Sequence, residues 1–216
     1  MSIASRLNEL KDKLPGTVRV VAVSKFHPVS AIREVYETGH RLFGESRVQE
    51  LLPKYEELPR DIQWHFIGHL QTNKVKQILP FIDTIESVDS ERLLREIDKE
   101  AGKIDRVVRV FLQVHIAQEE HKFGFSFREA EGLLTGGHLK SLSHVQVTGL
   151  MGMASLTDDT EQIRREFELL YAFYTKMKAA YSLSELSMGM SDDYPIAVEE
   201  GSTLVRIGSK IFGTRE

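Results

Sequence analysis

Lys25 ends an apolar run in the sequence VVAVSK and is the side chain best placed to act as a nucleophile. Alternation along a strand would place this side chain on the same face as Val21 and Val23. Apolar surroundings disfavour the charged form of an amine and lower its pKa, which exposes the lone pair that attacks an aldehyde. Lys25 is therefore a candidate for forming a Schiff base. The alternative role is a lysine at a strand end that extends its ammonium group into water.

Two turns, SMGMS at 187–191 and RIGS at 206–209, are rich in small residues and suit the binding of a phosphate group. Glycine lets backbone N–H groups approach an anion, and serine hydroxyls add donors. The candidate donors are Ser187, Ser191, Gly208 and Ser209. Small residues also make tight turns without any ligand. Asp192 and Asp193 would repel a phosphate unless their carboxylates point away.

Arg206 alternates with Leu204 and shares its predicted strand face with Gly208. An arginine that points into the interior of a fold needs an anion or another acceptor as a partner. That partner is either a bound ligand or an internal carboxylate, for which Glu45 and Glu86 are the candidates.

Eight apolar, β-branched segments alternate with helical patterns and must position these side chains. The expected strands are 17–25, 41–45, 62–68, 84–88, 107–116, 145–151, 185–189 and 204–208. The expected helices are 2–14, 28–39, 46–58, 72–80, 90–102, 126–136, 159–181 and 194–200. Strands that are apolar throughout are covered on both faces, which is typical of a parallel sheet. The pattern predicts an α/β fold with one domain over 1–216, a (β/α)8 TIM-type barrel with an extra N-terminal helix.

A doubly wound open sheet is the alternative, but its first turn is usually rich in glycine, whereas the first turn here reads SKFHP. In a barrel the chemistry lies at the carboxyl ends of the strands, and phosphate is often held between the loops after strands seven and eight. We therefore expect Lys25 and the two small-residue turns to lie at one mouth of the barrel.

Composition excludes several classes of function. The 28 Lys and Arg residues against 32 Asp and Glu residues give a net charge of −4, which disfavours nucleic-acid binding. The absence of cysteine excludes disulfides, zinc fingers and thiol catalysis. No signal-peptide pattern is visible and the apolar runs are too short to span a bilayer, so we expect a cytoplasmic protein without membrane contact. His65 and His69 are four apart on a strand and do not converge, so we expect no metal site.

A Schiff-base lysine, a phosphate cradle and an inward arginine together match the aldehyde, the phosphate and the pyridine nitrogen of pyridoxal 5′-phosphate (PLP). The cradle would suit another phosphorylated metabolite equally well. In that case Lys25 would be dispensable for binding.

Several motifs are more specific: VAVSKFHPVSAI, RLFGESRVQE, WHFIGHLQTNK, IESVD, KFGF, VTGLMGMA and LSMGMSDDYPIAVEEGSTLVRIGSKIFG. Through them nearly the whole chain resembles the YggS/PROSC family of PLP homeostasis proteins, which is related to the N-terminal barrel of alanine racemase. The resemblance implies that Lys25 carries PLP covalently as an internal aldimine. It also implies a phosphate site, a contact with the ring nitrogen and a methionine near the ring, formed by Ser191, Gly208, Ser209, Arg206 and Met151.

Two positions depart from the pattern of that family. Ser46 stands where the family usually has asparagine, so a ring contact from this position would lack an amide. Ser209 stands where the family commonly has threonine, and the hydroxyl is kept. With Ser187, these residues complete the expected cofactor site.

The expected function is the binding, buffering and delivery of PLP, a form of vitamin B6, and not catalysis. An arginine at the pyridine nitrogen leaves that nitrogen unprotonated, so the ring is a poorer electron sink. Racemisation needs acid–base groups on both faces of the substrate carbon, and no tyrosine is evident for the face opposite Lys25. PLP-dependent apo-enzymes are the expected recipients, and a monomer or weak dimer is the expected state. The alternative is a small PLP-dependent amino-acid racemase of the alanine racemase type.

Overall fold

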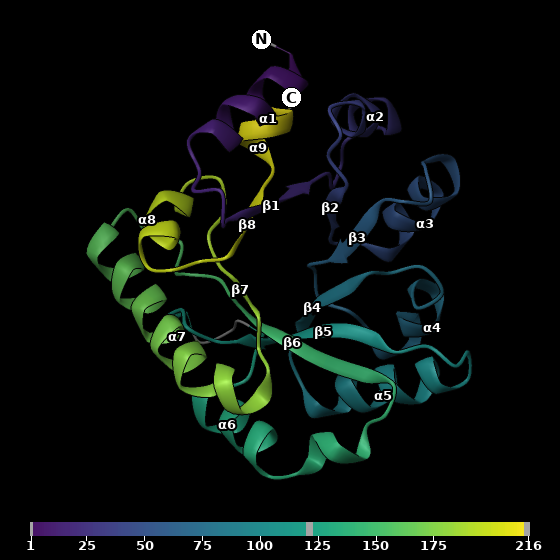
Figure 1. Ribbon diagram of the computed structural model, residues 1–216, viewed down its shortest axis with the longest axis vertical. Helices are drawn as coiled ribbons and strands as arrows, with labels where there is room; N and C mark the ends of the chain where they lie inside the picture. Colours follow the sequence, from purple (N-terminus) through teal and green to yellow (C-terminus); the bar gives the residue numbers. More distant parts are fainter. Residues whose placement is uncertain (1, 120–122, 214–216) are drawn as a thin grey trace.

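Eight parallel strands close into a barrel in the computed structural model of the protein, which describes residues 2–119 and 123–213 (Figure 1). The strands are β1 (Arg19–Val23), β2 (Leu42–Glu45), β3 (Gln63–Phe66), β4 (Thr84–Val88), β5 (Val108–Val114), β6 (Val145–Gly152), β7 (Glu185–Ser187) and β8 (Leu204–Ile207). Each strand pairs with its neighbour in sequence, and β1 pairs with β8 to close the ring. The expected (β/α)8 barrel is confirmed, and the open sheet is wrong.

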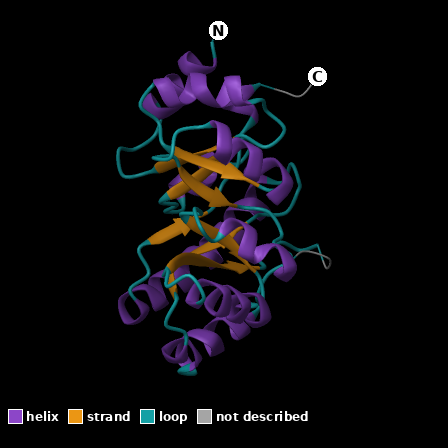
Figure 2. Cartoon of the chain, turned by 90° about the vertical axis from the view of Figure 1, so that its right-hand side faces the viewer, coloured by secondary structure: helices purple, strands orange, loops and turns teal. Residues whose placement is uncertain are grey.

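Helices enclose the barrel, with the strands running through the middle (Figure 2). They are α1 (Ile3–Asp12), α2 (Val29–Glu37), α3 (Val48–Glu57), α4 (Val75–Ile78), α5 (Glu91–Gly102), α6 (Phe127–Thr135), α7 (Thr160–Tyr181), α8 (Tyr194–Glu199) and α9 (Ser209–Phe212). The extra N-terminal helix α1 packs against α9, where Arg6 Nε donates to the carbonyl of Ile211 at 2.6 Å (Figure 1). In the ranges that the structure describes, no helix is long and apolar enough to span a membrane.

The observed helices differ from the predicted ones at two places. The helix expected at 72–80 is a 3₁₀ turn, Thr72–Lys74, followed by the single-turn helix α4. The short helix α9 was not expected, because four residues are too few to show a helical period. A further 3₁₀ turn, His138–Ser141, follows α6.

The first strand is shorter than expected, and this changes the setting of Lys25. β1 ends at Val23, although the N–H of Ser24 still donates to the carbonyl of Gly44 at 3.0 Å. The chain then turns, because Phe26 adopts a left-handed backbone with φ of +67°. Lys25 therefore lies in a turn after the strand and not on the strand itself.

Alternate residues of the strands face two separate cores. In β1, Val20 and Ala22 pack against the surrounding helices, whereas Val21 and Val23 face the barrel interior. The interior apolar cluster contains Val21, Val23, Leu42, Phe111, Met151 and Leu204. Buried ionic side chains fill much of the remaining interior, and these reach the site described next.

Candidate functional site

A pocket of about 440 Å³ lies at the carboxyl ends of the strands and collects the loops that follow them. Its lining residues are Val23, Lys25, His27, Ser46, Ile67, Met153, Met190, Ser191, Asp192, Arg206, Gly208, Ser209 and Gly213. The volume is within the usual range for small-molecule sites. The turns after β1, β7 and β8, which are far apart in the sequence, therefore meet here as the barrel argument requires.

Six of the eight predicted site residues line this pocket, namely Lys25, Ser46, Ser191, Arg206, Gly208 and Ser209. The other two do not line it. Met151 is fully buried in the interior apolar cluster, and Ser187 is fully buried beneath Arg206. Met153, two residues beyond Met151 along the chain, lines the pocket instead.

Helix α3 holds both residues that flank Lys25. Lys54 Nζ donates to the carbonyl of Ser24 at 2.9 Å. A carboxylate oxygen of Glu50 accepts from the N–H of Phe26 at 2.8 Å. The guanidinium of Arg47, at the start of α3, lies 4.7 Å from the centre of the Phe26 ring. A left-handed conformation at a phenylalanine costs about 1–3 kcal/mol, so these contacts offset the strain that the turn requires.

Lys54 is itself fixed by a buried carboxylate. Its ammonium lies 2.6 Å from Glu45 Oε1, and Ser24 Oγ donates to the same oxygen at 2.7 Å. Burial raises the pKa of Glu45, while Lys54 and Ser24 oppose that rise. We call Glu50 and Lys54 of α3, together with Glu45 at the end of β2, the α3 clamp, since they fix the turn that carries Lys25.

The two small-residue turns lie against each other at the other side of the pocket. The N–H of Gly208 donates to Ser191 Oγ at 3.3 Å. Gly189 is required in the first turn, because its φ is +94° and an added Cβ would lie 2.6 Å from Ala197 Cβ. Ser209 begins α9, and N–H groups in a first helical turn have no helical acceptor. The arrangement presents hydroxyl and N–H donors to an anion.

The two aspartates that follow the first turn, Asp192 and Asp193, have different surroundings. An Oδ1 of Asp193 accepts from the N–H of Met190 at 2.5 Å inside the turn, and burial raises the pKa of this carboxyl. The carboxyl of Asp193 is therefore engaged within the turn. Asp192 lines the pocket, and no other acidic side chain occurs among the described residues that line it. Two basic side chains, Lys25 and Arg206, line the same pocket.

Arg206 is held from inside the barrel. Its guanidinium donates to Ser187 Oγ at 2.6 Å and to the carbonyl of Gly152 at 2.8 Å. It also lies 3.9 Å from the carboxylate of Glu86. Of the two internal partners that the sequence left open, Glu86 is therefore the one used, and Glu45 pairs with Lys54 instead. Burial lowers the pKa of Arg206.

Glu86 continues into a chain of buried charges. It accepts from Ser187 Oγ at 2.5 Å and lies 2.6 Å from Nδ1 of His65. Nε2 of His65 is 3.5 Å from Asp83, which in turn pairs with Arg109. Burial alone would lower the pKa of His65, but the two nearby carboxylates, Asp83 and Glu86, raise it overall, and Glu86 is hydrogen-bonded to Nδ1. We call this series the interior ion chain; its members are Arg206, Glu86, His65, Asp83 and Arg109.

The acidic members of the interior ion chain remain ionised. Burial alone would raise the pKa of Glu86, but the hydrogen bond and charge of His65, with the charge of Arg206, lower it. The pKa of Asp83 is also lowered against the effect of burial, mainly through His65. Arg206 therefore faces a carboxylate on its inner side and keeps its charge and position at the pocket wall.

Sequence reasoning missed several contributors. His27 lines the pocket, and its ring stacks on Phe212 at 4.8 Å. Ile67 and Met153 follow the ends of β3 and β6, so the strand-end argument that found Lys25 could also have found them. No sequence signal marks Lys54, because a lysine on a helix is usually solvated.

The chemistry of the donor set fits PLP. The Lys25 amine, the Arg206 guanidinium and the hydroxyls of Ser191 and Ser209 share one pocket of suitable size. A Cβ added at Gly208 would meet nothing closer than the Val23 carbonyl at 3.4 Å, so packing within the protein does not demand a glycine there. The space beside Gly208 is consistent with an anion close to the backbone. Within residues 2–119 and 123–213, no cluster of three metal-ligating side chains occurs.

Comparisons with known proteins agree with this geometry. The sequence profile of the family described as "Alanine racemase, N-terminal domain" matches residues 1–216. A pyridoxal phosphate homeostasis protein of Aquifex aeolicus is 40% identical over 92% of this chain and 87% of its own length. The structure of PipY from Synechococcus elongatus without PLP is 40% identical, with a TM-score of 0.92 over 98% of this chain and 100% of PipY. The structure of PipY with PLP bound is 39% identical, with a TM-score of 0.89 over 98% of this chain and 100% of PipY.

Proposed function

The chain belongs to the family of the alanine racemase N-terminal domain, and from this premise we propose that it binds PLP at the carboxyl mouth of its barrel and serves PLP homeostasis. The observation that carries the proposal is the meeting of Lys25, Arg206 and the two small-residue turns in one pocket. Relatives named for PLP homeostasis and a PLP-bound PipY structure support the same cofactor.

Lys25 is the proposed point of covalent attachment. Its amine adds to the aldehyde of PLP, a carbon–nitrogen double bond forms and one water leaves. When bound, PLP supplies this electrophilic carbonyl on an aromatic ring. The α3 clamp holds the backbone on both sides of Lys25 and thereby limits where the amine can reach.

The remaining residues bind and orient the cofactor. Ser191, Gly208 and Ser209 are the proposed phosphate donors. Arg206 is the proposed neighbour of the ring nitrogen, and the interior ion chain keeps its guanidinium in place. Ser46 lines the pocket and offers a hydroxyl where the resemblance predicted an amide in other members.

Storage and delivery fit this pocket better than turnover. A fixed guanidinium is a hydrogen-bond donor and holds the ring nitrogen in its unprotonated form, which weakens the ring as an electron sink. Among the described residues that line the pocket there is no tyrosine to act opposite Lys25. PLP-dependent apo-enzymes are the proposed recipients of the cofactor.

Borohydride reduction after PLP addition tests the attachment site. Wild-type protein should gain the mass of one reduced PLP on the peptide that contains Lys25. Lys25→Ala should lose the adduct, while Lys76→Ala, an exposed position on α4, should keep it. An adduct of equal yield in Lys25→Ala would refute the attachment site, and the absence of any PLP binding by wild-type protein would refute the function.

Exchange of substrate α-protons in deuterated water separates storage from racemisation. The PLP-loaded protein is incubated with L-amino acids, and deuterium at the α-carbon is measured by NMR. We expect no exchange above that of free PLP. Exchange that depends on Lys25 would establish the racemase alternative instead.

A further inference from the structure

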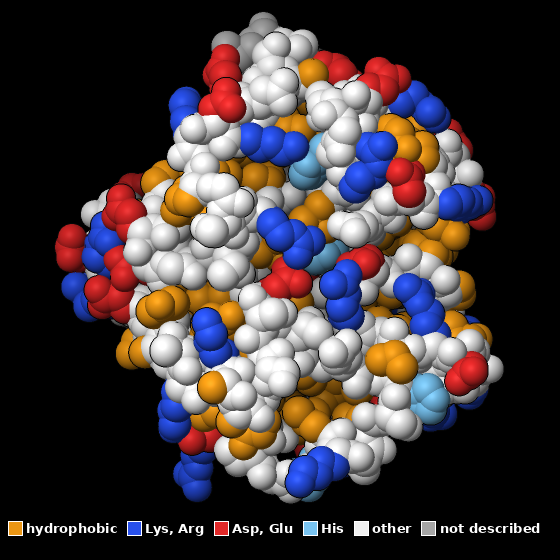
Figure 3. Space-filling view, in the orientation of Figure 1, with side chains coloured by type: hydrophobic (Ala, Val, Ile, Leu, Met, Phe, Trp, Pro, Cys, Tyr) orange, Lys and Arg blue, Asp and Glu red, His pale blue; other side chains and the backbone are white. Residues whose placement is uncertain are grey.

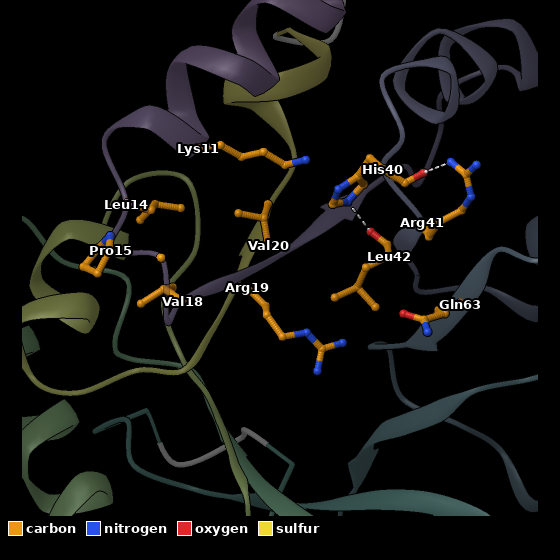
Figure 4. A pocket seen from close by; sticks show the side chains of 11 residues that line it. Lys11, Leu14, Pro15, Val18, Arg19, Val20, His40, Arg41, Leu42 and Gln63 are labelled. Atoms are coloured by element: carbon orange, nitrogen blue, oxygen red, sulfur yellow. Dashed lines mark hydrogen bonds between the residues drawn. The ribbon is translucent and has the colours of Figure 1, made fainter.

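A second pocket, of about 380 Å³, lies at the opposite mouth of the barrel, where β1, β2 and β3 begin. The end of α1, the loop that follows it and the first residues of these strands form its walls (Figure 4). Its polar side chains are Lys11, Arg19, His40, Arg41 and Gln63. No acidic side chain occurs among the described residues that line it. The proposed PLP site uses none of these side chains.

Three basic side chains, Lys11, Arg19 and Arg41, line this mouth in a chain whose net charge is −4. Figure 3 shows several Lys and Arg side chains and a histidine close together over the region of β1 and β2. Arg19 pairs with Glu185 at 3.0 Å and Arg41 pairs with Asp61 at 2.7 Å.

Lys11 differs from the two arginines. Within the described ranges no carboxylate forms an ion pair with it, and its pKa is lowered because neighbouring atoms partly desolvate the ammonium of this otherwise exposed side chain. The pocket therefore contains one cation whose charge is not balanced locally.

His40 lines the same pocket and lies between the two basic side chains Lys11 and Arg41 (Figure 4). Its Nε2 is 2.7 Å from the carbonyl of Leu42, so this nitrogen carries the proton of a neutral ring. Burial, together with the charges of Lys11 and Arg41, lowers the pKa of His40 to about 4. The ammonium of Lys11 is directed toward the His40 ring (Figure 4). A bound anion would reverse this repulsion and raise the pKa of His40.

The rest of the lining is apolar and consists of Leu14, Pro15, Val18, Val20 and Leu42. We propose that this pocket binds a small organic anion that has one negative charge and an apolar body, with Lys11 as the counter-ion. One locally unbalanced cation matches one negative charge better than the two charges of a phosphate. The apolar walls contact the body of the ligand.

Binding of benzenesulfonate, followed by NMR at neutral pH, tests the proposal. This probe keeps a single negative charge at all pH values used, and benzenesulfonamide is its neutral analogue. We expect saturable shifts of the His40 ring signals with benzenesulfonate, binding about tenfold weaker with benzenesulfonamide, and a His40 pKa that rises when the anion is present.

Charge variants locate the counter-ion. Lys11→Met keeps the apolar stem and should weaken benzenesulfonate binding about fivefold, the upper range for an exposed ion pair. Lys13→Met, an exposed lysine beside the pocket that does not line it, should leave the affinity unchanged. Both side chains are exposed, so both variants should fold as the wild type does.

Three results would overturn the proposal. The first is equal binding of the sulfonamide and the sulfonate, which would show an apolar pocket without charge recognition. The second is tighter binding of inorganic phosphate than of benzenesulfonate, and the third is the absence of any saturable shift. None of these results depends on PLP, so the test is independent of the proposed function.

Discussion

The two cations that line the proposed PLP pocket, Lys25 and Arg206, are held in opposite ways. Lys25 lies in a turn with a left-handed neighbour, and the α3 clamp holds that turn from outside the barrel. Arg206 lies on the regular strand β8, and the interior ion chain holds it from within. The attachment residue therefore depends on a strained turn held by side chains of a neighbouring helix, whereas the arginine depends on a network of buried charges within the barrel.

This difference predicts that loss of the two sets of contacts affects stability and PLP attachment to different degrees. Damage to the interior ion chain should cost mostly stability, because it leaves buried charges without partners. Damage to the α3 clamp should affect PLP attachment more strongly relative to stability, because the backbone at Lys25 loses its support. Four variants and the pH dependence of stability test this contrast.

Glu86→Gln should have the largest effect on stability. The substitution leaves Arg206 and His65 in the core without their carboxylate, and breaking a buried pair costs about 3–5 kcal/mol. Urea unfolding should show this loss. Glu91→Gln, which removes an exposed ion pair with Arg95, should cost less than about 1 kcal/mol. Equal effects of the two variants would show that the interior ion chain does not stabilise the barrel.

Lys54→Met should reduce stability by about 2 kcal/mol, because it breaks the buried pair with Glu45. The loss should be smaller than for Glu86→Gln, because burial raises the pKa of Glu45 and this carboxyl can become protonated once Lys54 is removed. The larger consequence should be functional. Without the bond to the Ser24 carbonyl, PLP attachment should weaken about tenfold. Lys99→Met, at an exposed position on α5, serves as the control. Unchanged attachment in a folded Lys54→Met protein would remove the α3 clamp as a positioning device.

The contrast also explains which features the sequence could predict. Period and strand-end position were enough to predict the barrel and to place Lys25, Ser191 and Arg206 at one mouth of it, because these features depend on local pattern and on topology. The α3 clamp could not be predicted, because the bond from Lys54 to Ser24 joins residues 30 positions apart through a single helix orientation. The turn at Phe26 was missed because a left-handed phenylalanine contradicts its local preference and is imposed by tertiary contacts.

Other contacts within the barrel show the same limit. The pairing of Glu86 with Arg206 was one of two candidates, since alternation gives the face of a strand but not the partner across the barrel. Met151 and Met153 share one face of the extended chain, yet the first lies inside the barrel and the second at its mouth. The depth of a residue along the barrel axis depends on the register of all strands, which the spacing in one segment does not give.

The pH dependence of stability should reveal His65. Its pKa is raised in the folded protein, so its contribution is fully present below the unfolded value of 6.5 and is lost as the pH rises through the folded value. Glu86 and Asp83 have lowered pKa values, so their contributions are present above their unfolded values of 4.5 and 3.8 and are lost in acid. The free energy of unfolding should therefore fall above pH 6.5, with a slope of up to about 1.4 kcal/mol per pH unit.

A His65→Gln variant isolates this contribution. Its free energy of unfolding, measured by urea titration between pH 6 and pH 9, should show a smaller decrease than that of the wild type. Identical slopes in the two proteins would mean that His65 does not carry its proton in the folded state. The interior ion chain would then lack its central positive charge.

Glu50→Ala should have the smallest effect on stability, about 1 kcal/mol, because it removes one hydrogen bond and two longer charge contacts, to Arg47 and Lys54, of a partly exposed carboxylate. The N–H of Phe26 loses its acceptor, and the left-handed turn loses one of its supports. PLP attachment should therefore slow by more than the stability change alone would suggest, whereas Glu57→Ala, an exposed position on the same helix, should alter neither property. Stopped-flow absorbance after PLP mixing measures the rate, and urea unfolding measures the stability. If attachment slowed only in proportion to lost stability, Glu50 would be a structural residue, and it would not position Lys25.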